Sequence, residues 1–205
     1  MIDELTDRHV RSLARALDDF GDEAQRLATW GRALAGVLTG GGRLLTAGNG
    51  GSAAEAQHLA AELVGKLAED RRPFSAIALN AETSSLTAIA NDYGFEEVFA
   101  RQVRAHGRRG DVLVLFSTSG ASPNLVAAAD AAQAIGVHTW AVTGPAPNPL
   151  ADVCEDALAV RSPEPQTVQE LHLMCVHLLC RQVEAALGMG RRPARRHLHL
   201  AGEPL

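Results

Sequence analysis

The sequence predicts an α/β fold built on a five-stranded parallel sheet, and three observations lead to this class. Short apolar runs alternate with helical segments along most of the chain. The runs lack the polar alternation of a half-solvated sheet, so they indicate strands covered on both faces. Two Gly/Ser-rich loops each join a strand to a helix, the order expected of right-handed βαβ units.

The first forty residues predict helix, because apolar side chains recur at three- and four-residue spacing until glycines 40–42 end the pattern. These side chains are Leu13, Ala16, Leu17, Leu27, Trp30, Leu34, Val37 and Leu38. We treat residues 1–40 as an N-terminal helical region. Such a region cannot bury both its faces on one small core, so it predicts an oligomer contact, with a simple packed cap as the alternative.

The five strands are expected over residues 43–47, 74–79, 111–116, 138–143 and 156–160. Helices are expected over residues 53–66, 84–91, 94–106, 124–135 and 167–187. Together they form one domain, residues 41–187, in which ligands bind beyond the carboxyl ends of the strands. Residues 188–205 are rich in Arg, His, Pro and Gly, and we expect them to form a flexible tail.

The charge balance narrows the range of partners. A net charge of -5 and a pI near 5.9 argue against nucleic acid and against an anionic membrane as partners. No stretch reaches the roughly 20 apolar residues of a membrane span, and acids occupy the first residues, so we expect a cytoplasmic protein. Three cysteines without a CxxC pair argue against a disulfide framework and a thiolate zinc site.

The first Gly-rich loop follows the first predicted strand and consists of Gly48, Asn49, Gly50, Gly51 and Ser52. Glycines let the backbone approach a ligand, and the start of the next helix points free N–H groups at an anion. Ser52 suits the N-cap of that helix. A purely structural strand-to-helix turn is the alternative.

The second loop follows the third strand and carries four hydroxyls, those of Ser117, Thr118, Ser119 and Ser122. Hydroxyls and helix-start amides can surround a phosphate without any lysine, which suits an acidic protein. Serines used only for capping and turns are the alternative. Two such loops on one parallel sheet predict a shared polyanion or sugar-phosphate site.

Three side chains are candidates for proton chemistry. His58 and Glu62 stand four residues apart, so both project from one face of a helix as a metal-binding or acid–base pair. His177 lies within an apolar helical run. The alternatives are a surface pair and a core histidine. Aldose–ketose isomerisation needs one base and one acid, whereas serine hydrolysis lacks its GxSxG motif in this chain.

Taken together, these motifs resemble the phosphoheptose isomerase family of the sugar isomerase (SIS) domain superfamily. The resemblance covers residues 13–187 and includes Gln57 and the segment from Ala90 to Phe95. It implies a three-layer, flavodoxin-like sheet and a homotetramer whose N-terminal helices join subunits that share active sites. It also implies conversion of D-sedoheptulose 7-phosphate to D-glycero-D-manno-heptose 7-phosphate through an enediol.

The resemblance assigns roles to individual residues. Glu62 and His177 correspond to the acid–base pair. Substrate contacts correspond to Asn49, Gly50, Gly51, Ser52, Glu62, Asn91, Asp92, Ser117, Thr118, Ser119, Ser122 and Gln169. In members that hold Zn²⁺, the ligands correspond to His58, Glu62, Gln169 and His177. The metal and acid–base roles fall on the same side chains, so a catalytic, a structural and an inhibitory zinc all stay open.

Three positions depart from the family pattern, namely Lys66, Ala121 and Gln166, so another phosphorylated sugar stays possible. The superfamily also contains a non-enzymatic scaffold that binds the bacterial replication initiator protein, and residues 78–80 and 86–92 resemble it. That relative lacks the paired carboxylate and imidazole that Glu62 and His177 provide, so the isomerase is favoured. A sugar-phosphate sensor or another isomerase are the remaining alternatives.

Overall fold

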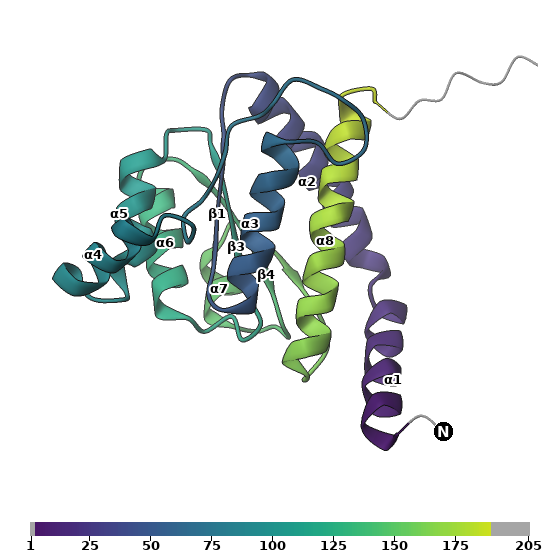
Figure 1. Cartoon of the computed structure of the whole chain (residues 1–205). Helices are drawn as coiled ribbons and strands as arrows, with labels where there is room; N and C mark the ends of the chain where they lie inside the picture. The colour runs from purple at the N-terminus through teal and green to yellow at the C-terminus, as the bar shows by residue number, and fades with distance from the viewer. Residues whose placement is uncertain (1–2, 190–205) are drawn as a thin grey trace, which may run out of the picture.

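A computed structural model describes residues 3–189 and shows three layers, with helices on both faces of a parallel sheet (Figure 1). The strand order is β2-β1-β3-β4-β5, which is the flavodoxin-like order. The strands are β1 (Leu44–Gly48), β2 (Ala76–Ala78), β3 (Val112–Ser117), β4 (His138–Thr143) and β5 (Asp156–Ala159). The predicted fold class is therefore confirmed.

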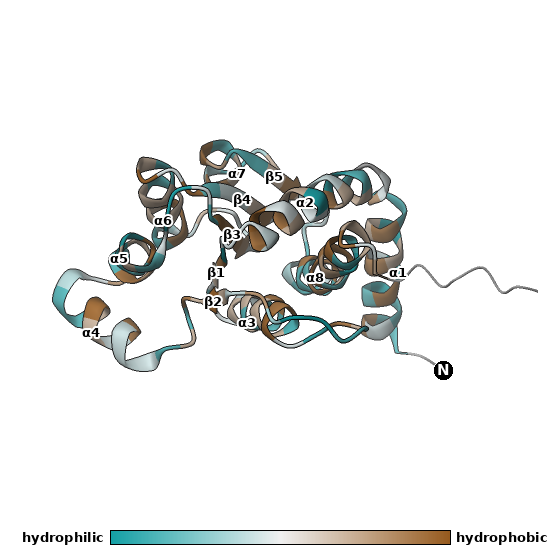
Figure 2. Ribbon diagram, turned by 90° about the horizontal axis from the view of Figure 1, so that it is seen from above, coloured by the Kyte–Doolittle hydropathy of each residue, from teal (hydrophilic) through white to brown (hydrophobic). Residues whose placement is uncertain are grey.

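The helices form two groups, one on each face of the sheet, as the view from above shows (Figure 2). One face carries α1 (Glu4–Asp18), α2 (Gly21–Thr39), α3 (Gly51–Val64) and α8 (Pro165–Ala186). The other carries α4 (Thr83–Tyr93), α5 (Glu97–His106), α6 (Pro123–Ala134) and α7 (Pro149–Val153). Each group buries its own hydrophobic cluster against the sheet.

The expectation that every strand is buried on both faces is correct for β1 and β3 but wrong for two others. Strands β2 and β5 are largely half-buried, because they form the edges of the sheet and have only one neighbouring strand each. Strand β2 is also shorter than predicted. Helix α7 was not predicted, although Asn148 accepts a hydrogen bond from the N–H of Ala151 and Pro149 begins the helix.

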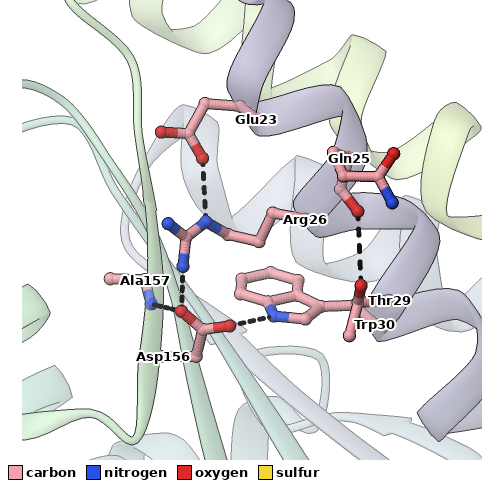
Figure 3. A network of polar contacts seen from close by, with 7 residues as sticks. All are labelled: Glu23, Gln25, Arg26, Thr29, Trp30, Asp156 and Ala157. Carbon is pink, nitrogen blue, oxygen red and sulfur yellow. Dashed lines mark hydrogen bonds and ion pairs between the residues drawn. The ribbon is translucent and has the colours of Figure 1, made fainter.

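The N-terminal region contains two helices, because the chain breaks at Asp19 and Phe20. Helix α2 belongs to the core: Trp30 stacks on Trp140 of β4 at 4.8 Å between ring centroids. Its indole N–H donates to Asp156 of β5 over 2.7 Å, and Arg26 pairs with the same carboxylate (Figure 3). Helix α2 therefore agrees with the alternative prediction, a helical cap packed on the core.

Helix α1 differs from α2, since Leu5, Val10 and Leu17 on it are exposed. An oligomer contact through this helix stays a prediction, as does the division of the chain at residues 40 and 187. Within the predicted tail, residues 190–205 lie outside the described residues. Among residues 3–189, none of the helices combines the length and apolar character that crossing a membrane requires.

Candidate active site

The turn from β1 into α3 brings backbone close to the end of the sheet. Gly50 is the N-cap and adopts a φ of +56°, a conformation that favours glycine. A Cβ on Gly48 would lie 2.3 Å from the carbonyl oxygen of Ser52, so the chain turns back at once into the helix. The prediction of Ser52 as N-cap is wrong, because the helix begins at Gly51, two residues earlier than predicted, and buries Ser52 inside its first turn.

The two predicted loops meet because β1 and β3 are adjacent, with Gly48 paired to Phe116. They line one small cavity of about 100 Å³ beyond the carboxyl ends of these strands. We call it the hydroxyl cavity; its lining residues are Asn49, Ser52, Phe116, Ser117, Thr118, Ser119, Ser122 and Gln169. The location suits a small anion held by hydroxyls and helix-start amides.

Some of these polar groups already hold the loops in shape. The Ser117 hydroxyl accepts from the N–H of Gly120 over 3.0 Å, and the Ser119 hydroxyl accepts from the N–H of Ala121 over 3.2 Å. The side-chain amides of Asn49 and Asn124 exchange two hydrogen bonds of 2.9 and 3.0 Å. Asn49 therefore braces the first loop against α6 as well as lining the cavity.

The three candidates for proton chemistry converge between α3 and α8. The ligand atoms of His58, Glu62 and His177 all lie within 4.8 Å of one another, and all three residues are half-buried. His58 Nε2 lies 3.1 Å from Glu62 Oε1, which confirms the shared helix face. The ring of His177 meets that of His58 edge-on at 5.0 Å. Glu62 Oε2 is buried without a hydrogen-bond partner in the described part of the chain.

Gln169 connects the hydroxyl cavity to this triad. It lines the hydroxyl cavity and also a second hollow of about 320 Å³, whose walls include Gly51, Glu55 and His58. A Cβ on Gly51 would lie only 2.4 Å from Gln169 Nε2, so the first loop and α8 are in close contact. The proposed phosphate site and the triad thus lie along one side of α8.

The structure does not bring Asn91 and Asp92 to this site within one chain. Both are exposed on α4, where the Asn91 amide donates to the Asp92 carboxylate over 2.8 Å. Helix α4 lies at the opposite side of the molecule from α8 (Figures 1 and 2). Ala121 is exposed in the second loop, Lys66 is exposed just after the end of α3, and Gln166 is exposed in the first turn of α8.

Sequence reasoning missed a buried polar pair beneath the triad. Glu55 lies three residues before His58 on α3, and His172 lies three residues after Gln169 on α8, so helical spacing was the available signal. It also missed Arg71, whose guanidinium contacts the end of α3. That contact has no sequence pattern, because it comes from an irregular segment.

A hydroxyl-lined cavity beyond the carboxyl ends of β1 and β3, with an imidazole–carboxylate triad between α3 and α8, is typical of an enzyme that acts on a small phosphorylated molecule. Residues 8–144 match the family model for the SIS domain. A phosphoheptose isomerase of Streptomyces coelicolor is 62% identical over 187 residues, covering 91% of this chain and 81% of the relative. The chain therefore belongs to the phosphoheptose isomerase family of SIS-domain enzymes.

Solved structures agree with this assignment. A phosphoheptose isomerase from Neisseria gonorrhoeae superposes with a TM-score of 0.83 at 38% identity, covering 90% of this chain and 100% of that one. A phosphoheptose isomerase from Francisella tularensis superposes with a TM-score of 0.83 at 31% identity, covering 87% of this chain and 96% of that one. The expected isomerase activity is thus the activity for which these relatives are named.

Proposed function

We propose that this enzyme converts D-sedoheptulose 7-phosphate to D-glycero-D-manno-heptose 7-phosphate. The observation that carries the proposal is the convergence of Glu62 and His177 on His58, because the hollow at His58 shares Gln169 with a cavity lined by five hydroxyl-bearing residues. The cavity would hold the phosphate, and the triad would face the reacting carbons. Gln169 lies between the two and would orient the sugar chain.

The chemistry needs two proton transfers that leave the atoms balanced. One group of the Glu62 and His177 pair, acting as base, removes a proton from C1 of the ketose while the other donates a proton to the C2 carbonyl oxygen. This gives the enediol. The proton held by the base then returns to C2, and the C1 hydroxyl loses its proton to the other group. C1 becomes the aldehyde, and both side chains recover their starting states.

The triad also suits Zn²⁺, with His58, Glu62 and His177 as ligands and Gln169 as a weaker fourth. Two imidazoles and a carboxylate are common zinc ligands, and the buried oxygen Oε2 of Glu62 without a partner in residues 3–189 fits a cation nearby. When bound, the metal would polarise the substrate carbonyl. Gln169 and Glu62 would then hold both metal and sugar.

We further propose that the active enzyme is a homotetramer in the cytoplasm. Asn91 and Asp92 are remote from the triad in their own chain, so they would complete the site of a neighbouring subunit. The exposed apolar residues of α1 support an additional subunit contact. A sedimentation measurement with and without residues 1–18 tests this arrangement.

The function is tested by incubating the purified protein with D-sedoheptulose 7-phosphate, with added Zn²⁺ and with a chelator. We expect the aldose phosphate as product. A parallel incubation with shorter ketose phosphates tests the substrate assignment, which Lys66, Ala121 and Gln166 leave open to another sugar. Turnover in none of the conditions, together with tight binding to the replication initiator protein, would identify a scaffold instead.

A further inference from the structure

The carboxylate proposed for proton transfer lies at the weakest part of its helix. Glu62 is the third residue from the end of α3, which finishes at Val64. The last four carbonyls of a helix have no partner within it, and terminal turns open more easily than the interior. The N–H of Gly65 satisfies the carbonyl of Ala61 over 2.8 Å. The turn that carries Glu62 needs further partners.

One arginine supplies them. Arg71 Nη2 donates to the backbone carbonyl of Glu62 over 2.7 Å, and Nη1 donates to that of Leu63 over 2.9 Å. The planar guanidinium presents its donors in a fixed fork, so the two bonds fix direction as well as distance. Arg71 therefore holds the backbone of the very residue whose side chain faces His58 and His177.

Arg71 is itself held firmly. Its guanidinium carbon lies 4.9 Å from the centre of the Phe74 ring, and Phe74 is buried in the same cluster as Leu63. The N–H of Phe74 also donates to the Leu63 carbonyl over 3.0 Å. The segment after α3 is thus fastened to the end of the helix by three hydrogen bonds, and a cation–π contact within the segment holds the Arg71 side chain.

The charges of Arg71 and Glu62 both act on one neighbour, the buried thiol of Cys180 on α8. Burial, which is the largest cause, and the charges of Glu62 and Glu184 together raise the pKa of Cys180 to about 12, and the charge of Arg71 opposes this increase. Arg71 Nε and Glu62 Oε2 are both buried, and neither finds a hydrogen-bond partner among residues 3–189.

We propose that Arg71 is a positioning residue for the isomerase reaction: it clamps the last turn of α3 so that Glu62 stays aligned with His177 and the substrate. The proposal rests on the proposed function of Glu62. A cap that served stability alone would leave the alignment of the carboxylate unaffected, and this difference can be measured.

The test compares three variants of the full-length enzyme. Arg71→Met removes the clamp, and Arg71→Lys keeps the charge but loses the fork. Arg72→Met is the matched control, because Arg72 is exposed and lies over the same ring at the longer distance of 5.7 Å. We expect Arg71→Met to lower kcat by about 10- to 100-fold with KM within about threefold, since small misplacements have effects of this size. The kcat of Arg71→Lys should lie between those of the wild type and Arg71→Met, and the kcat of Arg72→Met should equal that of the wild type.

A second readout needs no turnover. Zn²⁺ affinity, measured by competition with a chelating dye, should weaken about tenfold or more in Arg71→Met and stay unchanged in Arg72→Met. Wild-type kcat and Zn²⁺ affinity in Arg71→Met, with only a lower Tm, would overturn the clamp. If Arg71→Met does not fold, Arg71→Lys decides by the same two measurements. A wild type without turnover rejects the proposed function, and the Zn²⁺ titration then still supports or overturns the clamp.

Discussion

His172 Nδ1 lies 3.6 Å from Glu55 Oε2 in the layer between α3 and α8. The imidazole is fully buried and the glutamate is 7% exposed. Both ring nitrogens and this carboxylate oxygen find no hydrogen-bond partner in residues 3–189. The two side chains thus depend on each other, because a buried polar group left alone loses its hydration without replacement.

We predict that His172→Leu destabilises the fold by about 1–3 kcal/mol, because Glu55 then faces an apolar side chain. The double variant Glu55→Leu with His172→Leu should be closer to the wild type, since replacing a buried pair as a whole is often nearly neutral. Urea unfolding of both variants at neutral pH measures the difference. If the double variant loses as much free energy of unfolding as the two single variants together, Glu55 and His172 are not energetically coupled.

The second prediction concerns the carboxylate of the triad. Glu62→Gln should lower kcat by at least ~10²-fold while the fold is kept, because the amide cannot take up a proton. Glu97→Gln is the control, since Glu97 lies on α5 and pairs there with Arg104. Circular dichroism establishes folding in both variants. Near-full activity of Glu62→Gln would remove Glu62 from the proton-transfer step.

Gly51→Ala tests the contact between the first loop and α8. The new Cβ would meet Nε2 at the end of the flexible Gln169 side chain, so the chain folds but Gln169 is displaced from both cavities. We expect KM for the sugar phosphate to rise about tenfold, as for loss of one polar contact of about 1.4 kcal/mol.

Gly36→Ala on α2 is the matched control for that substitution. Apart from its two chain neighbours and the backbone of its own helix, its added Cβ would have no atom of the described chain within 4 Å. It should keep KM unchanged and raise stability by about 0.5–1 kcal/mol, because alanine is favoured over glycine inside a helix. An unchanged KM in Gly51→Ala would show that Gln169 does not contact the substrate.

The fourth prediction concerns acid stability at α4. Hydrogen bonds from Ser85 and Ser84 lower the pKa of Glu82, the N-cap of this helix, from 4.5 to about 2. A lowered pKa in the folded state means that Glu82 stabilises the fold above pH 4.5, and this contribution is lost as the pH falls towards 2. The free energy of unfolding of Glu82→Ala should therefore fall less between pH 4.5 and pH 2 than that of the wild type. Acid unfolding followed by circular dichroism measures this difference. In an NMR titration, the carboxyl resonance of Glu82 should titrate near pH 2.

The sequence was sufficient for features that depend on local pattern. The bounds of β4 agree residue for residue with the expected range, because its β-branched and aromatic residues run up to the turn residues Gly144 and Pro145 that follow. His58 and Glu62 were predictable from their spacing, which fixes a common face on any helix. The Gly-rich loops were recognisable because few other residues allow such turns.

Features that depend on tertiary packing could not be predicted from the sequence. The edge positions of β2 and β5 follow from the strand order, which no local pattern encodes. The break at Asp19 and Phe20 lies within an apolar periodicity that continues across it. Glu55 and His172 are 117 positions apart, and only the packing of α3 on α8 brings them together.

Gln169 and His177 project from the same straight helix, eight positions apart. A helix rises about 1.5 Å per residue, so the two side chains leave the axis about 12 Å from each other. In the proposed reaction, this spacing would separate the end of the substrate held in the hydroxyl cavity from the end that reacts at the triad. A sugar whose phosphate lies too few carbons from its carbonyl would then reach the hydroxyl cavity or the triad but not both, so substrates would be selected by length.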